Sequence, residues 1–406
     1  MKKNADRCYE KTKPKQTQFP QRPEMTATVY FRTNYENKPL RRLPENKRNQ
    51  TQRQNRSAHP PCRRSAAFWR VEDPASSESL TLAISNLQSR AMADSVPRNK
   101  KKKKHNPFTD WLFYLALRVL VVFLYLFDVE TNLNTARFLG RLLWKHYHRG
   151  RNRALDNLRA SYPQKSEQWI WQTGRRSFEH IAMLTIDILF TPRLVKTYNW
   201  RSYSRYKNIE RIKWMMKEGQ GVLMVTGHYG NFEIIGYLLG LFGFDIYSIA
   251  RPLDNKFVSN YLYGVRQRAG QKIIDKKGAA ELMAQISSSG ATLGFIADQD
   301  AGRKGIFVDF FGRKASTYKS IGLLAITNNV PIVVGYSRRI DNRFYFEIAA
   351  TRIILPEEWA KKDDPLTWVT AEYTKAIEEF VRQDPTQYWW LHRRWKHRPK
   401  EETQKS

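Results

Sequence analysis

Residues 222–242 read VLMVTGHYGNFEIIGYLLGLF. The stretch opens with an apolar run at residues 222–226 that predicts a β-strand, and it closes with residues 232–242, whose pattern predicts a helix. A glycine-containing turn lies between them, and Asn231 directly precedes the predicted helix as a typical capping residue. A strand that passes through a tight turn into a helix is the repeating unit of an α/β fold.

The same alternation continues toward the C-terminus. Short β-branched runs predict strands at residues 246–250, 292–297, 332–336 and 344–350, with helical runs between them at 257–268, 279–287 and 318–328. Before residue 220 the pattern is mainly helical, for example at 133–147 and 177–190. We therefore predict an α/β domain over residues 131–400, with a mixed or largely parallel sheet flanked by helices.

The first hundred residues have a different composition. The chain carries a net charge of +32, and residues 1–105 hold 25 Lys and Arg against 9 Asp and Glu, which is half of the excess. Few apolar runs occur there, so we predict a disordered basic tail over residues 1–106. A second interpretation is that translation starts at Met92. Such charge favours anionic partners (nucleic acid, phospholipid, phosphorylated glycolipid or an acidic carrier protein) without choosing among them.

An apolar segment follows a lysine run at residues 100–104. Residues 108–127, FTDWLFYLALRVLVVFLYLF, are about long enough to cross a bilayer. Arg118 lies near the centre, where it would cost roughly 2.5–3.5 kcal/mol. A single span, a helix lying in the interface and a core helix of a soluble domain are the three alternatives. Basic residues on both sides favour a helix embedded from the cytoplasmic face, so we assign residues 107–130 to a membrane-associating helix.

His228 and Glu233 are the candidate catalytic pair. His228 is expected at the carboxyl end of a strand, where open α/β sheets place their ligands. Glu233 could reach the far imidazole nitrogen, fix the tautomer and stabilise the imidazolium formed on proton uptake. The pair then suits a general base that activates a hydroxyl. A capping histidine and a solvated glutamate would show the same spacing, so the pair needs support from the rest of the chain.

Four ordered blocks give that support. They are residues 226–233 (TGHYGNFE), 250–255 (ARPLDN) followed by Arg266, 297–300 (ADQD) leading to 305–312 (GIFVDFFG) and 315–317 (AST), and 388–396 (YWWLHRRWK). Over about residues 108–399 the chain resembles the lipid A biosynthesis acyltransferases, late acyltransferases that add fatty acyl chains to Kdo-bearing lipid A precursors. The first block matches the H-x4-[DE] box of glycerolipid acyltransferases. The resemblance implies a glycerol-3-phosphate acyltransferase-like fold.

The resemblance also implies a direct transfer mechanism. His228, oriented by Glu233, would deprotonate an acceptor hydroxyl that attacks the thioester of acyl carrier protein or CoA. The sequence has no G-x-S-x-G elbow, and its two cysteines, Cys8 and Cys62, lie in the tail, so no separate nucleophile is expected. No metal or other cofactor is expected either.

The implied acceptor is a lipid A-type glycolipid at the cytoplasmic face of a bacterial inner membrane. A phosphatidylinositol mannoside or an ornithine-type aminolipid is the alternative acceptor, because the H-x4-[DE] box does not distinguish among membrane lipids. An anionic membrane surface is a further expected partner.

Five further residues complete the predicted site. Arg251 and Arg266 match arginines of the family, and guanidinium groups bind phosphate or sugar-acid carboxylate in bidentate fashion. Asp298 and Asp300 follow a predicted strand, so they are expected at the same sheet edge as the histidine, where they orient an arginine or bind acceptor hydroxyls. Metal binding by these two carboxylates is the alternative. Asn231 joins them as a substrate-binding residue.

Two aromatic groups allow more than one interpretation. Phe307, Phe310 and Phe311 line an acyl channel or pack in the core. Residues 388–396 mix aromatic with basic side chains, which fits either membrane-interface anchoring or nucleic-acid stacking. The resemblance favours a position near the lipid, and no nucleic acid is expected. The rival class, a non-enzymatic nucleic-acid-binding protein, predicts that a chain beginning at Met92 loses the main activity.

Overall fold

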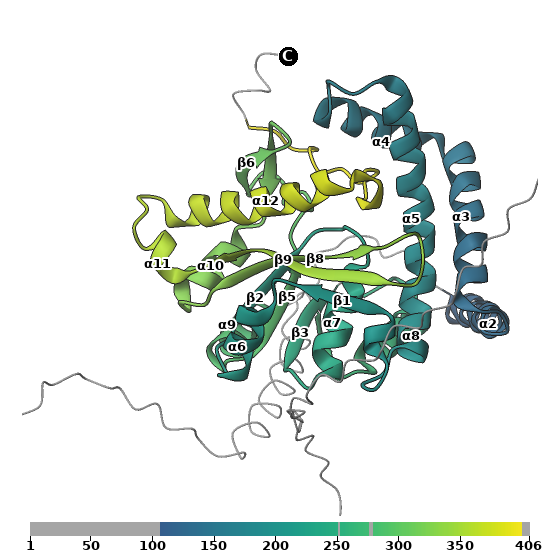
Figure 1. The fold of residues 1–406 in the computed structure, drawn as a ribbon, viewed down its shortest axis with the longest axis horizontal. Coiled ribbons are helices and arrows are strands. Elements are labelled where there is room, and N and C mark those ends of the chain that lie inside the picture. The colour runs from purple at the N-terminus through teal and green to yellow at the C-terminus, as the bar shows by residue number, and fades with distance from the viewer. Residues whose placement is uncertain (1–105, 251, 276–278, 400–406) are drawn as a thin grey trace, which may run out of the picture. The chain divides into compact units, whose positions relative to one another are not determined.

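A computed structural model describes residues 106–250, 252–275 and 279–399 of the chain. The predicted tail, the alternative start at Met92 and the site residue Arg251 lie outside the described residues. Within them, a seven-stranded sheet lies between two layers of helices, and a two-stranded hairpin stands beside it (Figure 1).

The sheet is largely parallel, as predicted. Its strand order is β1-β9-β8-β2-β5-β3-β4, and only the neighbours β8 and β9 are antiparallel. The strands are β1 (Ser204–Lys207), β2 (Leu223–Thr226), β3 (Ile246–Ala250), β4 (Lys272–Asp275), β5 (Thr292–Ile296), β8 (Ile332–Arg339) and β9 (Phe346–Ile354). The separate hairpin consists of β6 (Ile306–Phe310) and β7 (Arg313–Thr317). The five predicted strands are present, whereas β1, β4 and the hairpin were not predicted.

Helices surround the sheet and also form an N-terminal group. They are α2 (Pro107–Leu124), α3 (Val129–His146), α4 (His148–Ser161), α5 (Glu167–Leu194), α6 (Glu210–Lys217), α7 (Phe232–Leu241), α8 (Lys256–Gln267), α9 (Ala279–Ser288), α10 (Lys319–Thr327), α11 (Pro356–Trp359) and α12 (Pro365–Gln383). Short 3-10 turns occur at η1 (Trp200–Ser202) and η2 (Pro385–Gln387).

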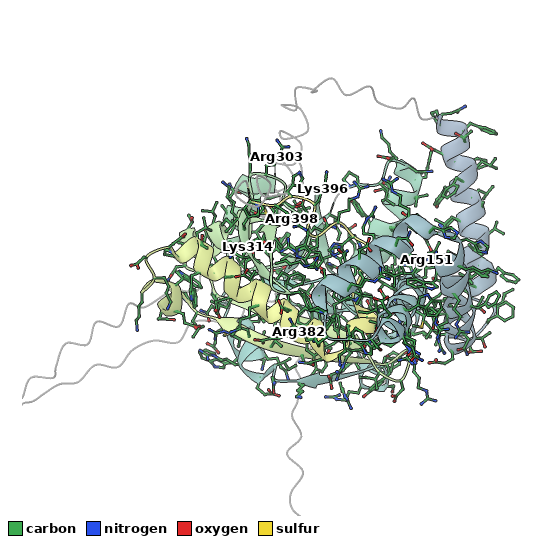
Figure 2. The ribbon with its side chains drawn as sticks, turned by 90° about the horizontal axis from the view of Figure 1, so that it is seen from above. Arg151, Arg303, Lys314, Arg382, Lys396 and Arg398 are labelled. Atoms are coloured by element: carbon green, nitrogen blue, oxygen red, sulfur yellow. The ribbon has the colours of Figure 1, made fainter. Side chains whose placement is uncertain are left out.

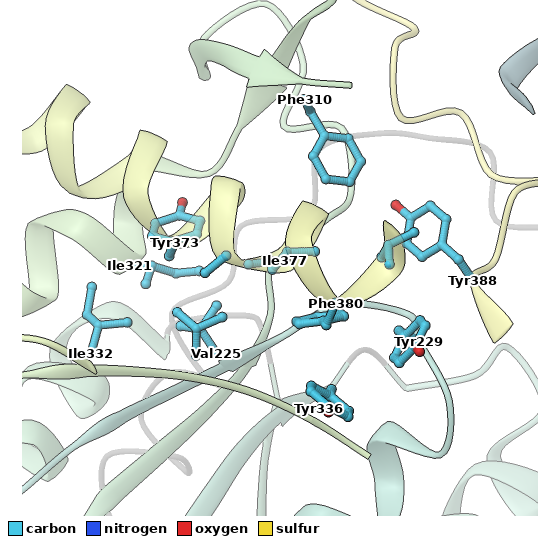
Figure 3. Close-up of a cluster of buried hydrophobic side chains, with 14 of the residues drawn as sticks. Val225, Tyr229, Phe310, Ile321, Ile332, Tyr336, Tyr373, Ile377, Phe380 and Tyr388 are labelled. Carbon is cyan, nitrogen blue, oxygen red and sulfur yellow. The ribbon is translucent and has the colours of Figure 1, made fainter. Parts of the chain in front are cut away.

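The alternation of side chains along β2 separates two layers. Val225 lies in a buried cluster with Ile377 and Phe380 of α12 and with Ile332 of β8 (Figure 3). Met224, its neighbour, points to the other face and lines a cavity beside α7. Each fully buried apolar side chain contributes roughly 1.5–3 kcal/mol to folding. The packing of α12 on this face of the sheet therefore stabilises the position of β2.

Phe310 and Phe311 belong to the buried core. They are 0% and 4% exposed, and Phe310 packs its ring against Tyr388 and Trp395 of the C-terminal segment. The core-packing interpretation is therefore correct for these two residues, and Phe307 in the same hairpin is half-buried.

The apolar helix α2 lies on the surface of the domain. The Asn106 side chain caps it by accepting from the Phe108 N–H at 3.0 Å, and only 6% of the helix is buried. By length and composition it could cross a membrane. Its exposed apolar side chains exclude the third alternative, a core helix. One edge of α2 touches α8, where Asn255 donates to the Asp110 carbonyl at 2.9 Å.

Candidate active site

The register of two neighbouring strands brings His228 and Asp298 together. Thr226, the last residue of β2, pairs with Ile296, the last residue of β5. His228 and Asp298 each follow two residues later, so both extend from the same sheet edge at the same level. A backbone hydrogen bond of 2.8 Å from Ala297 to Thr226 continues the ladder between them. The prediction that Asp298 lies near His228 is confirmed.

The Asp298 carboxylate holds both the ring and the backbone of His228. Its Oδ1 is 2.6 Å from Nδ1 of the imidazole, and its Oδ2 accepts the His228 N–H at 2.8 Å. The Asp298 side chain is 1% exposed. A carboxylate acceptor places the ring proton on Nδ1, which leaves a lone pair on Nε2. Gln299 Nε2 is 3.3 Å from that nitrogen, within reach as a weak donor.

Asp298 remains ionised although it is buried. Burial alone would raise its pKa, but the charge and hydrogen bonds of His228 and His392 hold the pKa well below its ordinary value. An ionised carboxylate fixes the tautomer of the imidazole and stabilises its protonated form.

Glu233 is placed differently from our prediction. Its carboxylate forms a short ion pair with Arg266 of α8, and both side chains line the cavity beside α7. In the described residues the hydrogen-bond partner of the His228 Nδ1 is Asp298 and not Glu233. The physical reason is that Glu233 belongs to the first turn of α7, which faces α8, whereas β5 delivers a carboxylate directly beside the imidazole.

Neighbouring segments hold the loop that carries His228. The Gly230 N–H donates to the Gln387 carbonyl at 3.0 Å, and the Trp389 N–H donates to the His228 carbonyl at 3.1 Å. Gly230 has φ +54°, and a Cβ at this position would collide with the carbonyl oxygen of Ser337. Glycine is therefore required here by both the backbone conformation and the close approach of β8.

His180 of α5 forms a hydrogen bond with the loop. Its Nε2 is 3.1 Å from the Gly230 carbonyl, and the side chain is 4% exposed. Burial, followed by the charge of Arg339, lowers the pKa of His180 to about 3. The ring is therefore neutral near pH 7, and its Nε2–H donates to Gly230.

Asn231 is confirmed as the cap of α7. Its side chain accepts from the Ile234 N–H at 3.1 Å and is 0% exposed. Its backbone N–H donates to the Ser337 carbonyl at 2.9 Å. Its assignment to substrate binding stays a prediction.

The C-terminal segment supplies residues that sequence reasoning did not single out. His392 lies with its ring centre 5.8 Å from that of His228, and its Nε2 is 3.6 Å from Asp298 Oδ2. Burial lowers the pKa of His392, against the opposing effect of Asp298. The Trp389 ring lies 5.2 Å from the His228 ring. The resemblance block and the mixture of aromatic and basic residues at 388–396 pointed to this segment, but neither singled out His392 or Trp389.

Asp300 and Arg394 join this segment to the strand edge. The Asp300 carboxylate lies 2.7 Å from His397 Nδ1. In this structure it therefore holds the C-terminal segment and does not contact His228. Arg394 is 1% exposed and donates to the Ser316 carbonyl at 2.5 Å and to Thr317 Oγ1 at 2.6 Å. The segment thus closes over the sheet edge through buried polar contacts.

One group of side chains in the described part of the chain has the composition of a metal site. His228, Asp298 and His392 offer ligand atoms that lie within 4.8 Å of one another. The 2.6 Å between His228 Nδ1 and Asp298 Oδ1 is the length of a direct hydrogen bond and leaves no room for an ion between these two atoms. The geometry fits an oriented imidazole better than a coordinated one.

A narrow apolar cavity of about 80 Å³ lies between α7 and the sheet, on the opposite face of the sheet from α12. Its walls are mainly aliphatic and aromatic, including Phe232, Leu239 and Phe295, and Glu233 and Arg266 form a polar part of its lining. The Phe232 ring also packs against His228, with 5.3 Å between ring centres. The imidazole and the cavity are therefore neighbours, separated by one side chain.

Several known proteins are similar to this chain in sequence. The family described as bacterial lipid A biosynthesis acyltransferase matches residues 98–397. A lipid A biosynthesis lauroyltransferase of Escherichia coli K12 is 26% identical over 299 residues, which is 71% of this chain and 92% of that protein. A palmitoleoyltransferase of the same strain is 24% identical over 296 residues, with the same coverage. A lipid A biosynthesis acyltransferase of Haemophilus influenzae is 28% identical over 211 residues, 50% of this chain and 65% of that protein.

The match spans the sheet, the His228 loop and the C-terminal segment that closes over it. This chain belongs to the bacterial lipid A biosynthesis acyltransferase family, and it is an enzyme, an acyltransferase.

Proposed function

We propose that the enzyme moves a fatty acyl chain from an acyl thioester to a hydroxyl of a lipid A-type glycolipid, with His228 as the general base. The observation that carries the proposal is the hydrogen bond of His228 with a buried Asp298 at the sheet edge, beside an apolar cavity. The names of the relatives, a lauroyltransferase and a palmitoleoyltransferase of lipid A biosynthesis, support the choice of substrate class.

The chemistry needs one base that acts twice. The acceptor O–H gives its proton to Nε2 of His228 while its oxygen bonds to the thioester carbonyl carbon. The tetrahedral intermediate then expels the thiolate, which takes the proton back from Nε2 as the C–S bond breaks. Asp298 stabilises the imidazolium between these two steps. We assign to Asp298 the orienting role that the sequence led us to give to Glu233.

Glu233 and Arg266 act on the substrate side of the site in this proposal. Their ion pair lies in the lining of the apolar cavity, where it can position the ester-forming end of a lipid. The cavity of about 80 Å³ is smaller than the roughly 300–1,000 Å³ of typical ligand pockets. A bound acyl chain would therefore push α7 or α8 outward.

Basic side chains near the site suit an anionic donor. Arg303, Lys314, Lys396 and Arg398 gather around the β6–β7 hairpin and the C-terminal segment (Figure 2). The same segment binds Asp300, two residues after Asp298. We propose that acyl carrier protein docks on these four residues, with the phosphates of acyl-CoA as the alternative ligand. We also propose that α2 holds the enzyme at the cytoplasmic face of the inner membrane.

The test is a transfer assay with purified enzyme, an acyl thioester of carrier protein or CoA, and a lipid A precursor, with the ester product detected by mass spectrometry. His228→Ala should abolish product formation. His146→Ala, an exposed histidine at the end of α3, is the matched control and should leave turnover unchanged. Substantial turnover by His228→Ala would reject the general-base mechanism. A product on a phosphatidylinositol mannoside or an aminolipid alone would reject the proposed acceptor.

A further inference from the structure

A groove of about 410 Å³ lies between α2 and α8, and it shares no lining residue with the apolar cavity. Two arginines, Arg118 of α2 and Arg268 just after α8, line it together with the aromatic rings of Tyr114, Phe257 and Tyr261. The rings pack across the two helices, with Tyr114 stacked on Phe257 at 6.0 Å. The groove therefore has aromatic walls and two positive charges.

The position of Arg118 is unusual because it belongs to an apolar, exposed helix. Its guanidinium lies 4.9 Å from the centre of the Tyr261 ring and donates to the Tyr114 hydroxyl at 3.0 Å. These contacts hold the group in the groove instead of letting it extend along the helix toward either end. The guanidinium lies over the Tyr261 ring, and the N–H donors other than the one on Tyr114 remain available to a ligand.

Neither arginine has an acidic partner among the residues that the structure describes. Arg266, two positions before Arg268 and in the last turn of α8, is held by Glu233. Both arginine side chains are exposed, so they are accessible to an anion from outside the described residues.

We propose that this groove binds the phosphate of a bilayer phospholipid headgroup, with Arg118 and Arg268 as its ligands. The inference rests on the membrane location of α2 given under the proposed function. Guanidinium groups match phosphate oxygens in bidentate geometry, and Tyr side chains prefer the depth of the headgroups. The exposed apolar side chains of α2, such as Trp111, Phe113 and Val119, would enter the acyl region beside the bound headgroup.

The bound phosphate also assigns an orientation to α2. A helix crossing the bilayer upright would carry Arg118 to the hydrocarbon centre, at a depth without phosphates. A helix lying in the interface keeps Arg118 at phosphate depth along with Arg268. Of the alternatives that remained for residues 108–127, the groove therefore favours the interfacial helix. Val265 of α8 lines this groove and also the small pocket that contains Glu233, so the membrane contact and the site share one helix.

The experiment measures co-sedimentation of the full chain with phosphatidylcholine vesicles that contain phosphatidylglycerol. Arg118→Gln and Arg268→Gln should each lower the partition coefficient about 5-fold. The matched control is Arg193→Gln, an exposed arginine that stacks on Tyr125 at 4.8 Å but does not line the groove. It should change the partition by less than about 2-fold. Arg118→Lys keeps the charge without the planar fork and should give an intermediate value.

Several outcomes would overturn the proposal. Equal losses for Arg193→Gln and Arg118→Gln would mean diffuse surface charge without a site. Unchanged vesicle binding, together with a raised KM for the lipid A precursor in detergent micelles, would make the groove an acceptor subsite instead. Wild-type protein that does not sediment with vesicles would remove the membrane location itself. The micelle assay reads acyl transfer separately, so failure of transfer with normal Arg-dependent vesicle binding would reject only the proposed reaction.

Discussion

Asp298 and Glu233 are both close to His228 in sequence or in space, but only Asp298 bonds to the imidazole. Neutralising each of the two carboxylates should therefore affect catalysis in a different way. Asp298→Asn removes the charge that orients the ring and stabilises the imidazolium. We expect kcat to fall roughly 10⁴-fold, the size of the loss for the same change in a Ser-His-Asp triad.

Glu233→Gln is the comparison for that measurement. It leaves the His228–Asp298 pair in place and weakens the Glu233–Arg266 contact beside the cavity, so KM should change more than kcat. Both variants are measured in the micelle assay, with circular dichroism as the control for folding. A larger loss of kcat for Glu233→Gln than for Asp298→Asn would return the orienting role to Glu233.

His180 gives the fold a pH dependence of its own. Its pKa falls from an ordinary 6.5 to about 3 because it is buried, so below pH 6.5 the unfolded chain binds a proton that the folded protein does not. The free energy of unfolding should therefore decrease as pH falls, by about 1.4 kcal/mol per pH unit from this residue.

Denaturant unfolding of the wild type and of His180→Gln, from pH 6.5 to about pH 5, measures this effect. Glutamine keeps an N–H donor for the Gly230 carbonyl but does not titrate, so its curve should be flatter with pH. Parallel curves for the two proteins would show that His180 does not cause the acid sensitivity.

At the scale of elements, the loop between β2 and α7 depends on Gly230. Alanine at this position would strain a backbone with φ +54° and would drive its Cβ into Ser337. Gly243, in the turn after α7, has φ +82° with no atom near its Cβ position, so Gly243→Ala carries the strain without the collision. Gly243→Ala should cost about 1 kcal/mol, and Gly230→Ala should cost more and also lower kcat.

Thermal unfolding and the transfer assay together measure both variants. The geometry explains the expected difference, because displacing Gly230 also displaces the backbone of His228 two residues away. If the two substitutions reduce stability and kcat equally, the close approach of β8 to the loop does not contribute to either quantity.

Much of the element pattern follows from local sequence. The runs at 222–226 and 292–297 were recognisable as strands because β-branched and apolar residues are concentrated there. The strand order was not recognisable, and it decides that β5 lies beside β2 and brings Asp298 to His228. Glu233 was misplaced for the same reason, since sequence spacing does not show which way the first turn of α7 faces. The strands β1 (SRYK) and β4 (KIID) contain charged residues, so neither forms an apolar run like that of β2 (LMVT).

The C-terminal segment shows another limit of sequence reasoning. His392 reaches Asp298 across a long separation in sequence, through buried contacts of Arg394 with the β7 strand. The periodicity of apolar residues along the sequence does not predict such a contact. Block matches identified residues 388–396 as important, and only the three-dimensional arrangement shows that they pack against His228.

At the scale of the whole molecule, two deletions separate membrane binding from catalysis. A chain beginning at Met92 keeps α2 and the whole range that matches the family, residues 98–397. It should retain both membrane pelleting and turnover in micelles. Loss of turnover would instead support the rival nucleic-acid-binding class.

Deleting α2 from that shorter chain should move the protein from the membrane pellet to the supernatant. The exposed apolar side chains of α2 are the physical reason, because their burial in lipid contributes about 25 cal/mol per Å². Fractionation by centrifugation, followed by immunoblotting, compares the two chains directly. Continued pelleting without α2 would place the membrane anchor elsewhere.

The closure of the site by residues 388–397 has a consequence for synthesis. The ribosome makes α2 early and these residues late, and His392 and Arg394 complete the surroundings of Asp298. On the proposed membrane role of α2, a nascent chain meets the bilayer well before it can assemble a working site. We therefore expect catalytic competence only after the last of these residues has left the exit tunnel, with the enzyme already at the membrane.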